Sequence, residues 1–477
     1  MGRLGRLNSL AIGALSVAAC AGSGAIGGGN GGGGGAADAG AAGGTSGSGG
    51  VSGSGGSIGV GGAGGSGGAG ADAAARAVVD ASTLLHKFLM GYQGWFACPA
   101  DGAPTNRWVH WFRSQTPAAA NVTVDLWPDL TELADDELFA TTMTLPGGQP
   151  ARLYSAWTPA TVQRHFRWMR DADLDGVMLQ RFSSELGDQS LFAFRNQVTK
   201  NVRSGAEQYG RVFAVMYDVS GANAATLLDT LKTDWSYLVN TLKVTESDRY
   251  LRHQGKPLLA IWGLGFAAGP TAAQAQAIIT YFKTGAPAAE QVTLLGGVPW
   301  GWRTLTNDAR PEADWSAVYR SFDVLSPWTV GAFANNAGAD NFLSRQVAPD
   351  LAAAQAAGIA YMPVVFPGFS WKNLKGAPSP LNQIPRQGGA FYWHQLDNVL
   401  GAGAAMLYGA MFDEVDEGTA LFKVAATPAA QPAQGTFVPL NIDGQSLPSD
   451  WYLRLTGAAG AVLRGEQTRS STIPITP

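Results

Sequence analysis

Four acidic residues stand within five positions near the end of the chain, inside the segment 412–418. They are Asp413, Glu414, Asp416 and Glu417. Carboxylates held this close repel one another, which separates their pKa values and lets one hold a proton while another stays ionised. An acid and base pair of this kind is what the cleavage of a glycosidic bond requires. A solvated acidic loop and a Ca²⁺ site with Asp413 and Asp416 as ligands are the alternatives.

Aromatic and polar side chains recur where the chain leaves its apolar segments. Flat rings with a polar edge suit sugar faces, whereas a single tryptophan is more often core packing. The recurrence at many segment ends favours a carbohydrate cleft. The candidate substrate-binding residues are Trp95, His110, Tyr217, Asp218, Trp262, Trp300, Trp302, Trp328 and Trp371. Arg181 is a candidate partner for the carboxylate cluster, and Cys98 is expected to be a small buried residue rather than a nucleophile.

A regular alternation of elements must position these side chains. Eight near-continuous apolar segments are typical of strands buried on both faces of a parallel sheet. They are 87–96, 176–182, 211–219, 257–264, 292–300, 324–330, 361–369 and 404–414. Stretches with helical spacing separate them, at 161–172, 190–209, 223–243, 271–284, 311–321, 339–357 and 386–402.

This alternation predicts an α/β fold, a (β/α)₈ TIM barrel. A doubly wound open sheet is the alternative, but no glycine-rich phosphate turn follows the first strand. In a barrel the carboxyl ends of the strands form the active-site face, so the aromatic residues and segment 412–418 are expected to meet there. Residues 97–157 would be one long functional loop. The tail from 424 is expected to pack beneath the barrel.

The first twenty residues have the features of an export signal. Arg3 and Arg6 precede an apolar stretch, 10–19, that is too short to span a bilayer. Residues 17–20 look like a bacterial lipobox, in which Cys20 would be lipidated; a soluble secreted protein is the alternative. Residues 21–70 hold 27 glycines and one charged residue, so 21–75 is expected to be a disordered tether. Its reach is roughly 40 Å.

The remaining composition excludes several protein classes. The formal net charge is −4 and there are no runs of Lys or Arg, which argues against a nucleic-acid partner. Two cysteines exclude a disulfide scaffold and a Cys-rich zinc site. No later segment reaches eighteen apolar residues, so we expect no transmembrane helix. The 76–477 domain is therefore expected to be exported and lipid-anchored to the outer membrane or cell surface.

Several motifs resemble those of bacterial proteins grouped near glycoside hydrolase families 71 and 99, over roughly residues 85–457. They are Gly91-Tyr92-Gln93-Gly94-Trp95-Phe96, Trp108-Val109-His110-Trp111, Val215-Met216-Tyr217-Asp218-Val219-Ser220-Gly221, Gly255-Lys256-Pro257, Ala260-Ile261-Trp262-Gly263 and Phe412 to Gly418. The resemblance implies a (β/α)₈ fold. Family 99 endo-α-mannosidases carry two glutamates three positions apart after the last strand, which implies catalytic Glu414 and Glu417 here. Glu414 would act as base on the sugar 2-hydroxyl, giving an anhydro-sugar, and Glu417 as acid and then base, with retention of configuration.

The same resemblance leaves the sugar open. Family 99 has Trp-His between the glutamates, whereas this chain has Val415-Asp416. An α-mannan-like substrate, an α-glucan as in family 71 and a pentose-containing glycan are the choices. We expect a surface-tethered glycoside hydrolase that binds carbohydrate, needs no cofactor or metal, and touches the membrane through its lipid anchor alone. The alternative is a glycan-binding lipoprotein that has lost catalysis.

Overall fold

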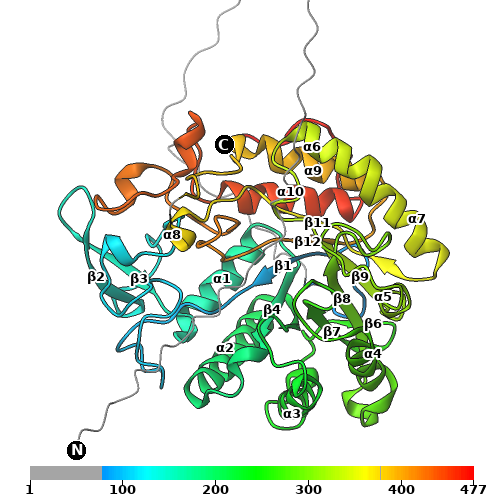
Figure 1. Ribbon diagram of the computed structural model, residues 1–477. Coiled ribbons are helices and arrows are strands. Elements are labelled where there is room, and N and C mark those ends of the chain that lie inside the picture. The colour runs from blue at the N-terminus through cyan, green and yellow to red at the C-terminus, as the bar shows by residue number, and fades with distance from the viewer. Residues whose placement is uncertain (1–77, 377) are drawn as a thin grey trace, which may run out of the picture. The chain divides into compact units, whose positions relative to one another are not determined.

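The computed structural model describes residues 78–376 and 378–477 (Figure 1). The proposed signal peptide, lipobox Cys20 and tether lie outside the described residues. Parallel strands form the centre of the molecule, in the order β10-β9-β8-β7-β5-β4-β1-β12-β11. Their bounds are β1 Phe88–Tyr92, β4 Gly176–Phe182, β5 Val212–Asp218, β7 Lys256–Trp262, β8 Thr293–Pro299, β9 Val324–Trp328, β10 Ala360–Tyr361, β11 Val364–Val365 and β12 Leu407–Gly409. The eight predicted strands are thus present, most of them slightly shorter than expected.

The seventh predicted strand, 361–369, is divided into β10 and β11. Met362 and Pro363 interrupt it, because proline has no N–H to donate to a neighbouring strand. The interruption still joins the two edges of the sheet. The Met362 N–H donates to the carbonyl of Leu325 in β9, and the Pro363 carbonyl accepts from the N–H of Tyr408 in β12. The sheet therefore closes on itself as a (β/α)₈ barrel, which confirms the predicted fold class.

Helices surround the strands, as Figure 1 shows. They are α1 Pro159–Asp171, α2 Gln189–Tyr209, α3 Leu227–Asn240, α4 Ala272–Thr280, α5 Trp315–Tyr319, α6 Asn336–Phe342, α7 Ala348–Ala356, α8 Lys372–Lys375, α9 Ala390–Gly401 and α10 Trp451–Leu463. In α1, Pro159 occupies the first turn, where its missing N–H costs nothing, and Val162, Phe166 and Met169 form the buried face. Every residue of β1, β4, β5 and β8 is buried, which explains their continuous apolar sequences.

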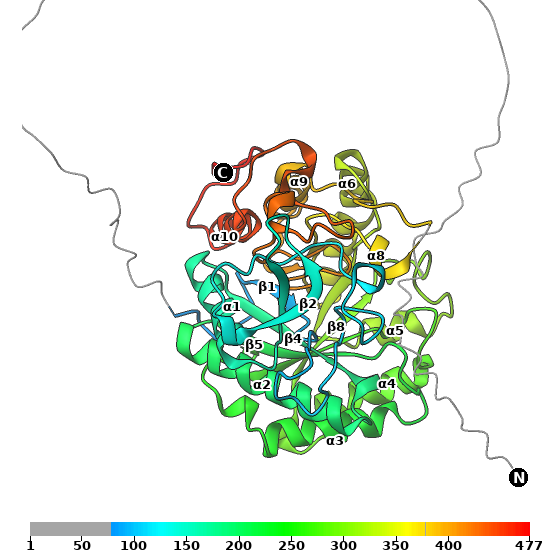
Figure 2. The same cartoon turned by 90° about the vertical axis from the view of Figure 1, so that its left-hand side faces the viewer.

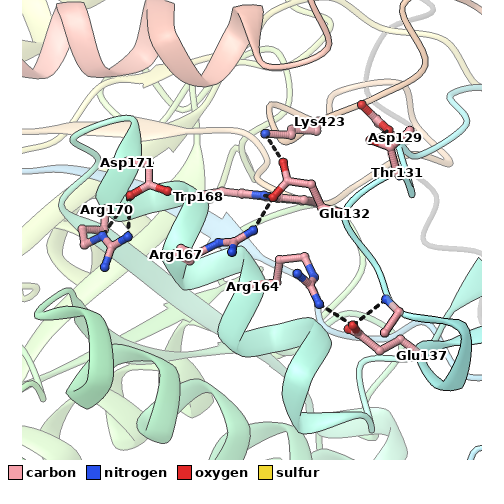
Figure 3. Close-up of polar contacts among 11 residues, drawn as sticks. Asp129, Thr131, Glu132, Glu137, Arg164, Arg167, Trp168, Arg170, Asp171 and Lys423 are labelled. Atoms are coloured by element: carbon pink, nitrogen blue, oxygen red, sulfur yellow. Dashed lines mark hydrogen bonds and ion pairs between the residues drawn. The ribbon is translucent and has the colours of Figure 1, made fainter. Parts of the chain in front are cut away.

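The long connection between β1 and α1 contains an antiparallel hairpin, β2 Leu138–Thr144 and β3 Pro150–Tyr154. The hairpin lies to one side of the strands in Figure 1 and faces the viewer in Figure 2. Two glutamates attach this connection to α1 (Figure 3). Glu137 pairs with Arg164, and Glu132 pairs with Arg167 and with Lys423, which follows the acidic segment. Ion pairs therefore fix the connection to α1 and to the residues that follow the acidic segment.

The C-terminal part of the chain covers the amino ends of the strands. The carbonyl of Leu463, at the end of α10, lies 3.2 Å from Nδ1 of His86, which precedes β1. Arg464 pairs with Asp175, which precedes β4. The end of α10 thus packs at the end of the barrel opposite to segment 412–418, as predicted for the tail. The earlier part of the tail differs from the prediction, because it contacts the β1–α1 connection at the carboxyl end: the Ala425 N–H donates to the Trp127 carbonyl and the Val438 N–H to the Asp125 carbonyl, each at 2.8 Å. Within residues 78–376 and 378–477, no helix has both the length and the apolar composition of a membrane span.

Candidate active site

The acidic segment follows β12 and turns into the carboxyl end of the barrel. All four carboxylates are buried: Asp413 is 1% exposed, Glu414 5%, Asp416 2% and Glu417 8%. This burial excludes the solvated acidic loop. It also means that each carboxylate has lost most of its hydration, so hydrogen bonds and neighbouring charges decide which of them are ionised.

Asp413 joins the last strand to the first. Its Oδ1 accepts a hydrogen bond of 2.7 Å from the backbone N–H of Gln93, and Oδ2 accepts one of 2.9 Å from that of Gly94. Because both oxygens face N–H donors, Asp413 is arranged as a structural acceptor and not as a Ca²⁺ ligand. The role of Asp413 is therefore to fix the segment 413–418 relative to the end of β1.

Glu414 and Glu417 have different hydrogen-bond environments. Glu414 Oε1 accepts from Gln93 Nε2 at 2.6 Å, and its Oε2 accepts from Thr419 Oγ1 at 2.6 Å. These donors favour the ionised carboxylate. No described residue donates a hydrogen bond to the Glu417 carboxylate; only its backbone carbonyl is engaged, by the Ser370 N–H at 2.9 Å. Of the two glutamates, Glu417 is therefore the one whose carboxyl group is more easily kept protonated.

Burial and mutual repulsion raise the pKa of every carboxylate in the segment. Burial, followed by the charge of Asp416, raises the pKa of Glu417 to about 8. Burial, followed by the charges of Glu417 and Asp416, raises the pKa of Glu414 well above its usual range. Burial raises the pKa of Asp413 and of Asp416 to about 7 each. The two glutamates influence each other's protonation. Because Gln93 and Thr419 donate to Glu414 and favour its ionised form, we assign the proton of the pair to Glu417.

Asp125, in the β1–α1 connection, holds this segment in place. Its N–H donates to the Val415 carbonyl at 3.0 Å. Its carboxylate accepts from Ser370 Oγ and from the N–H groups of Lys372, at 2.8 Å, and Asn373, at 2.7 Å. The segments after β1, β11 and β12 therefore meet at one buried residue, through its backbone and its side chain. Sequence analysis missed Asp125, because nothing near it in sequence distinguishes it from other loop aspartates.

Trp95 and His110 lie together beside the carboxylates. Their rings stack with centroids 3.8 Å apart and an interplanar angle of 9°, and Phe182 covers Trp95 at 5.2 Å. Arg195 lies over the Phe182 ring, 4.7 Å from its centroid. His110 Nδ1 is 3.7 Å from Asp416 Oδ2. The Trp95 indole N–H is buried without an acceptor among the described residues, so it is available to a bound molecule.

Trp262 and Trp328 form a second aromatic group, at the ends of β7 and β9. Their rings meet edge to face with centroids 5.6 Å apart, and both are half-buried. Neither indole N–H has an acceptor among the described residues. Asp218 is paired with Trp262 in the sheet, and burial raises its pKa to about 6. These side chains present hydrogen-bonding groups at the same end of the barrel as the carboxylates.

The other predicted aromatic residues differ in their surroundings. Trp300 and Trp371 are half-buried at the ends of β8 and before α8, and Trp300 packs against Phe342 at 5.5 Å. Trp302 is 1% exposed and its indole N–H donates to Asp350 at 2.9 Å. This engagement removes Trp302 from the proposed substrate-binding set. Its role is to hold the β8 connection against α7.

Tyr217 and Arg181 also require correction. Tyr217 is fully buried, and its hydroxyl donates to Asp234 of α3 at 2.6 Å. Arg181 forms two hydrogen bonds of 2.5 Å with the same carboxylate, so it does not pair with the acidic segment. Both side chains point out of the barrel interior into the layer beneath α3, and we remove them from the site. Cys98 is fully buried, as predicted.

Comparison with known structures finds the same fold in two solved structures of one enzyme. The GH99 endo-α-mannosidase of Bacteroides thetaiotaomicron in complex with Bis-Tris propane superposes with a TM-score of 0.58 at 16% identity, covering 81% of this chain and 100% of the other. A second structure of that enzyme gives a TM-score of 0.57 at 16% identity, covering 80% and 99%. No protein-family model and no curated protein matches the sequence. The predicted resemblance is confirmed for the fold.

Proposed function

We propose that this protein is a glycoside hydrolase that cleaves a poly- or oligosaccharide with Glu414 and Glu417. The observation that carries the proposal is that two buried carboxylates at the carboxyl end of a (β/α)₈ barrel have different hydrogen-bond donors. Glu414 accepts hydrogen bonds from Gln93 and Thr419, whereas Glu417 accepts none from the described residues. An ionised carboxylate beside a protonated one is the pair that glycosidic cleavage uses. The fold shared with GH99 endo-α-mannosidase structures supports the same class.

Each glutamate then has a defined step. Glu417 gives its proton to the glycosidic oxygen as the bond to the anomeric carbon breaks. Glu414 takes the proton of the sugar 2-hydroxyl, whose oxygen bonds to the anomeric carbon and forms an anhydro-sugar. In the second half, Glu417 takes a proton from water, the water oxygen attacks the anomeric carbon, and Glu414 returns its proton to the 2-oxygen. Two displacements at one carbon retain its configuration.

Aromatic rings and unpaired indole N–H groups are suited to the sugar itself. Trp95, Trp262 and Trp328 each offer an indole N–H without a partner among the described residues, and Trp262 and Trp328 are also half-buried at the strand ends. Stacking on ring faces and donation to hydroxyl oxygens both favour an uncharged glycan. The negative charge of the acidic segment disfavours an anionic one. An α-mannan-like or α-glucan-like substrate is consistent with these features.

The proposal is tested by glycan cleavage with matched variants of the full chain. The parent, Glu414→Gln and Glu417→Gln are incubated with α-mannans, α-glucans and arabinoxylans, and new reducing ends are measured. The surface variant Glu246→Gln, which disturbs only an exposed pair with Lys243, is the control. We expect cleavage by parent and control, and a loss of roughly 10²-fold or more in each site variant. Binding of a glycan without any cleavage by the parent would favour the catalytically inactive, glycan-binding alternative.

We further propose that the domain is exported and tethered through a lipid on Cys20. The support is the sequence of residues 1–75 alone. Incorporation of labelled palmitate into the parent, and its loss in Cys20→Ala, is the expected result. A parent chain that is released into the medium without label would contradict the lipid anchor while leaving the hydrolase proposal intact.

A further inference from the structure

Asp416 is a third buried carboxylate to which the proposed hydrolysis gives no step. It is 2% exposed, and its Oδ1 has no hydrogen-bond partner among the described residues. Its Oδ2 lies 3.7 Å from His110 Nδ1, which is beyond hydrogen-bond distance. A buried carboxylate oxygen without a donor is unfavourable for folding. Such an arrangement in the middle of a site therefore calls for a functional explanation.

The charge of Asp416 has no compensating cation beside it. Burial lowers the pKa of His110 to about 3, so the imidazole that faces Asp416 is neutral. The other charged groups facing this corner are Asp413, Asp125, Glu185 with its partner Arg195, and Lys375. Asp125 adds a like charge, and Arg195 is committed to Glu185 at 2.6 Å. Burial raises the pKa of Asp416 itself to about 7, so above neutral pH its carboxylate is ionised and its charge acts on Glu414 and Glu417.

We propose that Asp416 is a positioning residue for the proposed hydrolysis, whose charge keeps the proton on Glu417 until the glycosidic oxygen takes it. An ionised carboxylate next in the chain makes the loss of the Glu417 proton to solvent unfavourable. When the glycosidic oxygen accepts that proton, the two adjacent negative charges favour its return from water in the second half of the reaction. Asp416 thus extends the pH range over which Glu417 can act as an acid.

The direction in which the alkaline limb of kcat/KM moves distinguishes an electrostatic role of Asp416 from a merely structural one. Asp416→Asn keeps the shape and removes the charge, so the pKa of Glu417 falls and the alkaline limb of kcat/KM moves to lower pH, by about one unit. Lys375 is exposed, and its charge lowers the pKa of Glu417. Lys375→Gln therefore moves the same limb to higher pH. A structural defect in either variant would lower the rate without moving the limb in opposite directions.

A readout independent of activity is needed, because this inference rests on the proposed function. In the full chain with ¹³C-labelled glutamate carboxyls, the resonance lost in Glu417→Gln identifies Glu417, and its titration is followed in parent, Asp416→Asn and Lys375→Gln. A midpoint lowered by about one unit in Asp416→Asn supports the inference. An unchanged midpoint overturns it, whether or not a glycan is cleaved. A lowered midpoint in a protein that cleaves no glycan shows that the Asp416 charge acts on Glu417 but rejects the hydrolase, and with it the catalytic purpose of that charge. Asp416→Ser replaces the asparagine variant if the latter melts early.

Discussion

Gln93 and Glu414 are joined by a hydrogen bond of 2.6 Å between Nε2 and Oε1, although 321 positions separate them in the chain. The backbone N–H of the same glutamine holds Asp413 at 2.7 Å. One residue at the end of the first strand therefore orients two carboxylates that follow the last strand. Because the amide donates to Glu414, it stabilises the ionised form that the proposed base requires.

Replacement of Gln93 should impair the base without affecting the acid. In Gln93→Met the pKa of Glu414 rises further, so the acidic limb of kcat/KM moves to higher pH and the rate at neutral pH falls about tenfold or more. The alkaline limb stays in place. Gln163→Met, which removes a surface hydrogen bond to Ser204, is the matched control. An acidic limb that does not move in Gln93→Met would contradict the role given to this amide.

The acidic segment should make the fold less stable as the pH rises. Asp413 and Asp416 have a folded-state pKa of about 7 and Glu417 of about 8, each raised mainly by burial. A carboxyl whose pKa is raised on folding contributes stability below its unfolded pKa, near 4, and that contribution is lost as the pH rises through the folded value. The free energy of unfolding should therefore decrease between pH 5 and 8.5, measured by denaturant titration. Asp416→Asn should reduce this decrease by about 1–2 kcal/mol, and a stability that rises over the same range would refute the argument.

Asp234 should be among the most sensitive buried positions. It neutralises the fully buried Arg181 and accepts the Tyr217 hydroxyl. Asp234→Asn leaves the arginine without a counter-charge and should lower the free energy of unfolding by about 3–5 kcal/mol. The double variant Arg181→Met with Asp234→Leu should recover most of that loss, and a double-mutant cycle measures the coupling. Equal losses in the single and double variants would show that shape, and not charge, dominates.

Two tryptophans from the predicted set should respond in opposite ways. Trp95→Phe keeps an aromatic ring for the stack with His110 and removes an indole N–H that has no partner among the described residues, so KM should rise while the melting temperature changes little. Trp302→Phe removes the donor to buried Asp350, so unfolding should be easier by about 1–3 kcal/mol while KM is unchanged. Glycan titrations and thermal unfolding distinguish the two. The reverse pattern would restore Trp302 to the site and exclude Trp95.

The strands could be predicted from sequence because burial on both faces makes them continuously apolar. The division at Pro363 follows from the missing N–H and was foreseeable, but a continuous hydrophobic pattern on both sides concealed it. The acidic segment was also foreseeable, since its position directly after an apolar strand placed it at the carboxyl end of the barrel. The hydrophobic pattern of the sequence was sufficient for prediction wherever a residue's surroundings were set by its own strand.

Side-chain partners from other elements could not be predicted in this way. Trp300 and Trp302 are two residues apart, yet one packs on Phe342 and the other donates to Asp350, because the turn after β8 sends them to different neighbours. Arg181 pairs with Asp234, which is 53 residues away on a helix whose rotation is set by packing. Such partners depend on the tertiary arrangement, and single-sequence periodicity contains no information about it.

Asp125 forms hydrogen bonds to segments that are far apart in the sequence, and this has a consequence for biosynthesis. Its backbone and carboxylate bind residues 370–373 and 415, and its carbonyl accepts the N–H of Val438 at 2.8 Å. Contacts that span some three hundred residues form only after the intervening chain has been made. A ribosome-bound or partly translocated chain that ends before residue 414 lacks both glutamates. The proposed active site is therefore assembled only after synthesis of this region is complete, when the polypeptide is nearly finished.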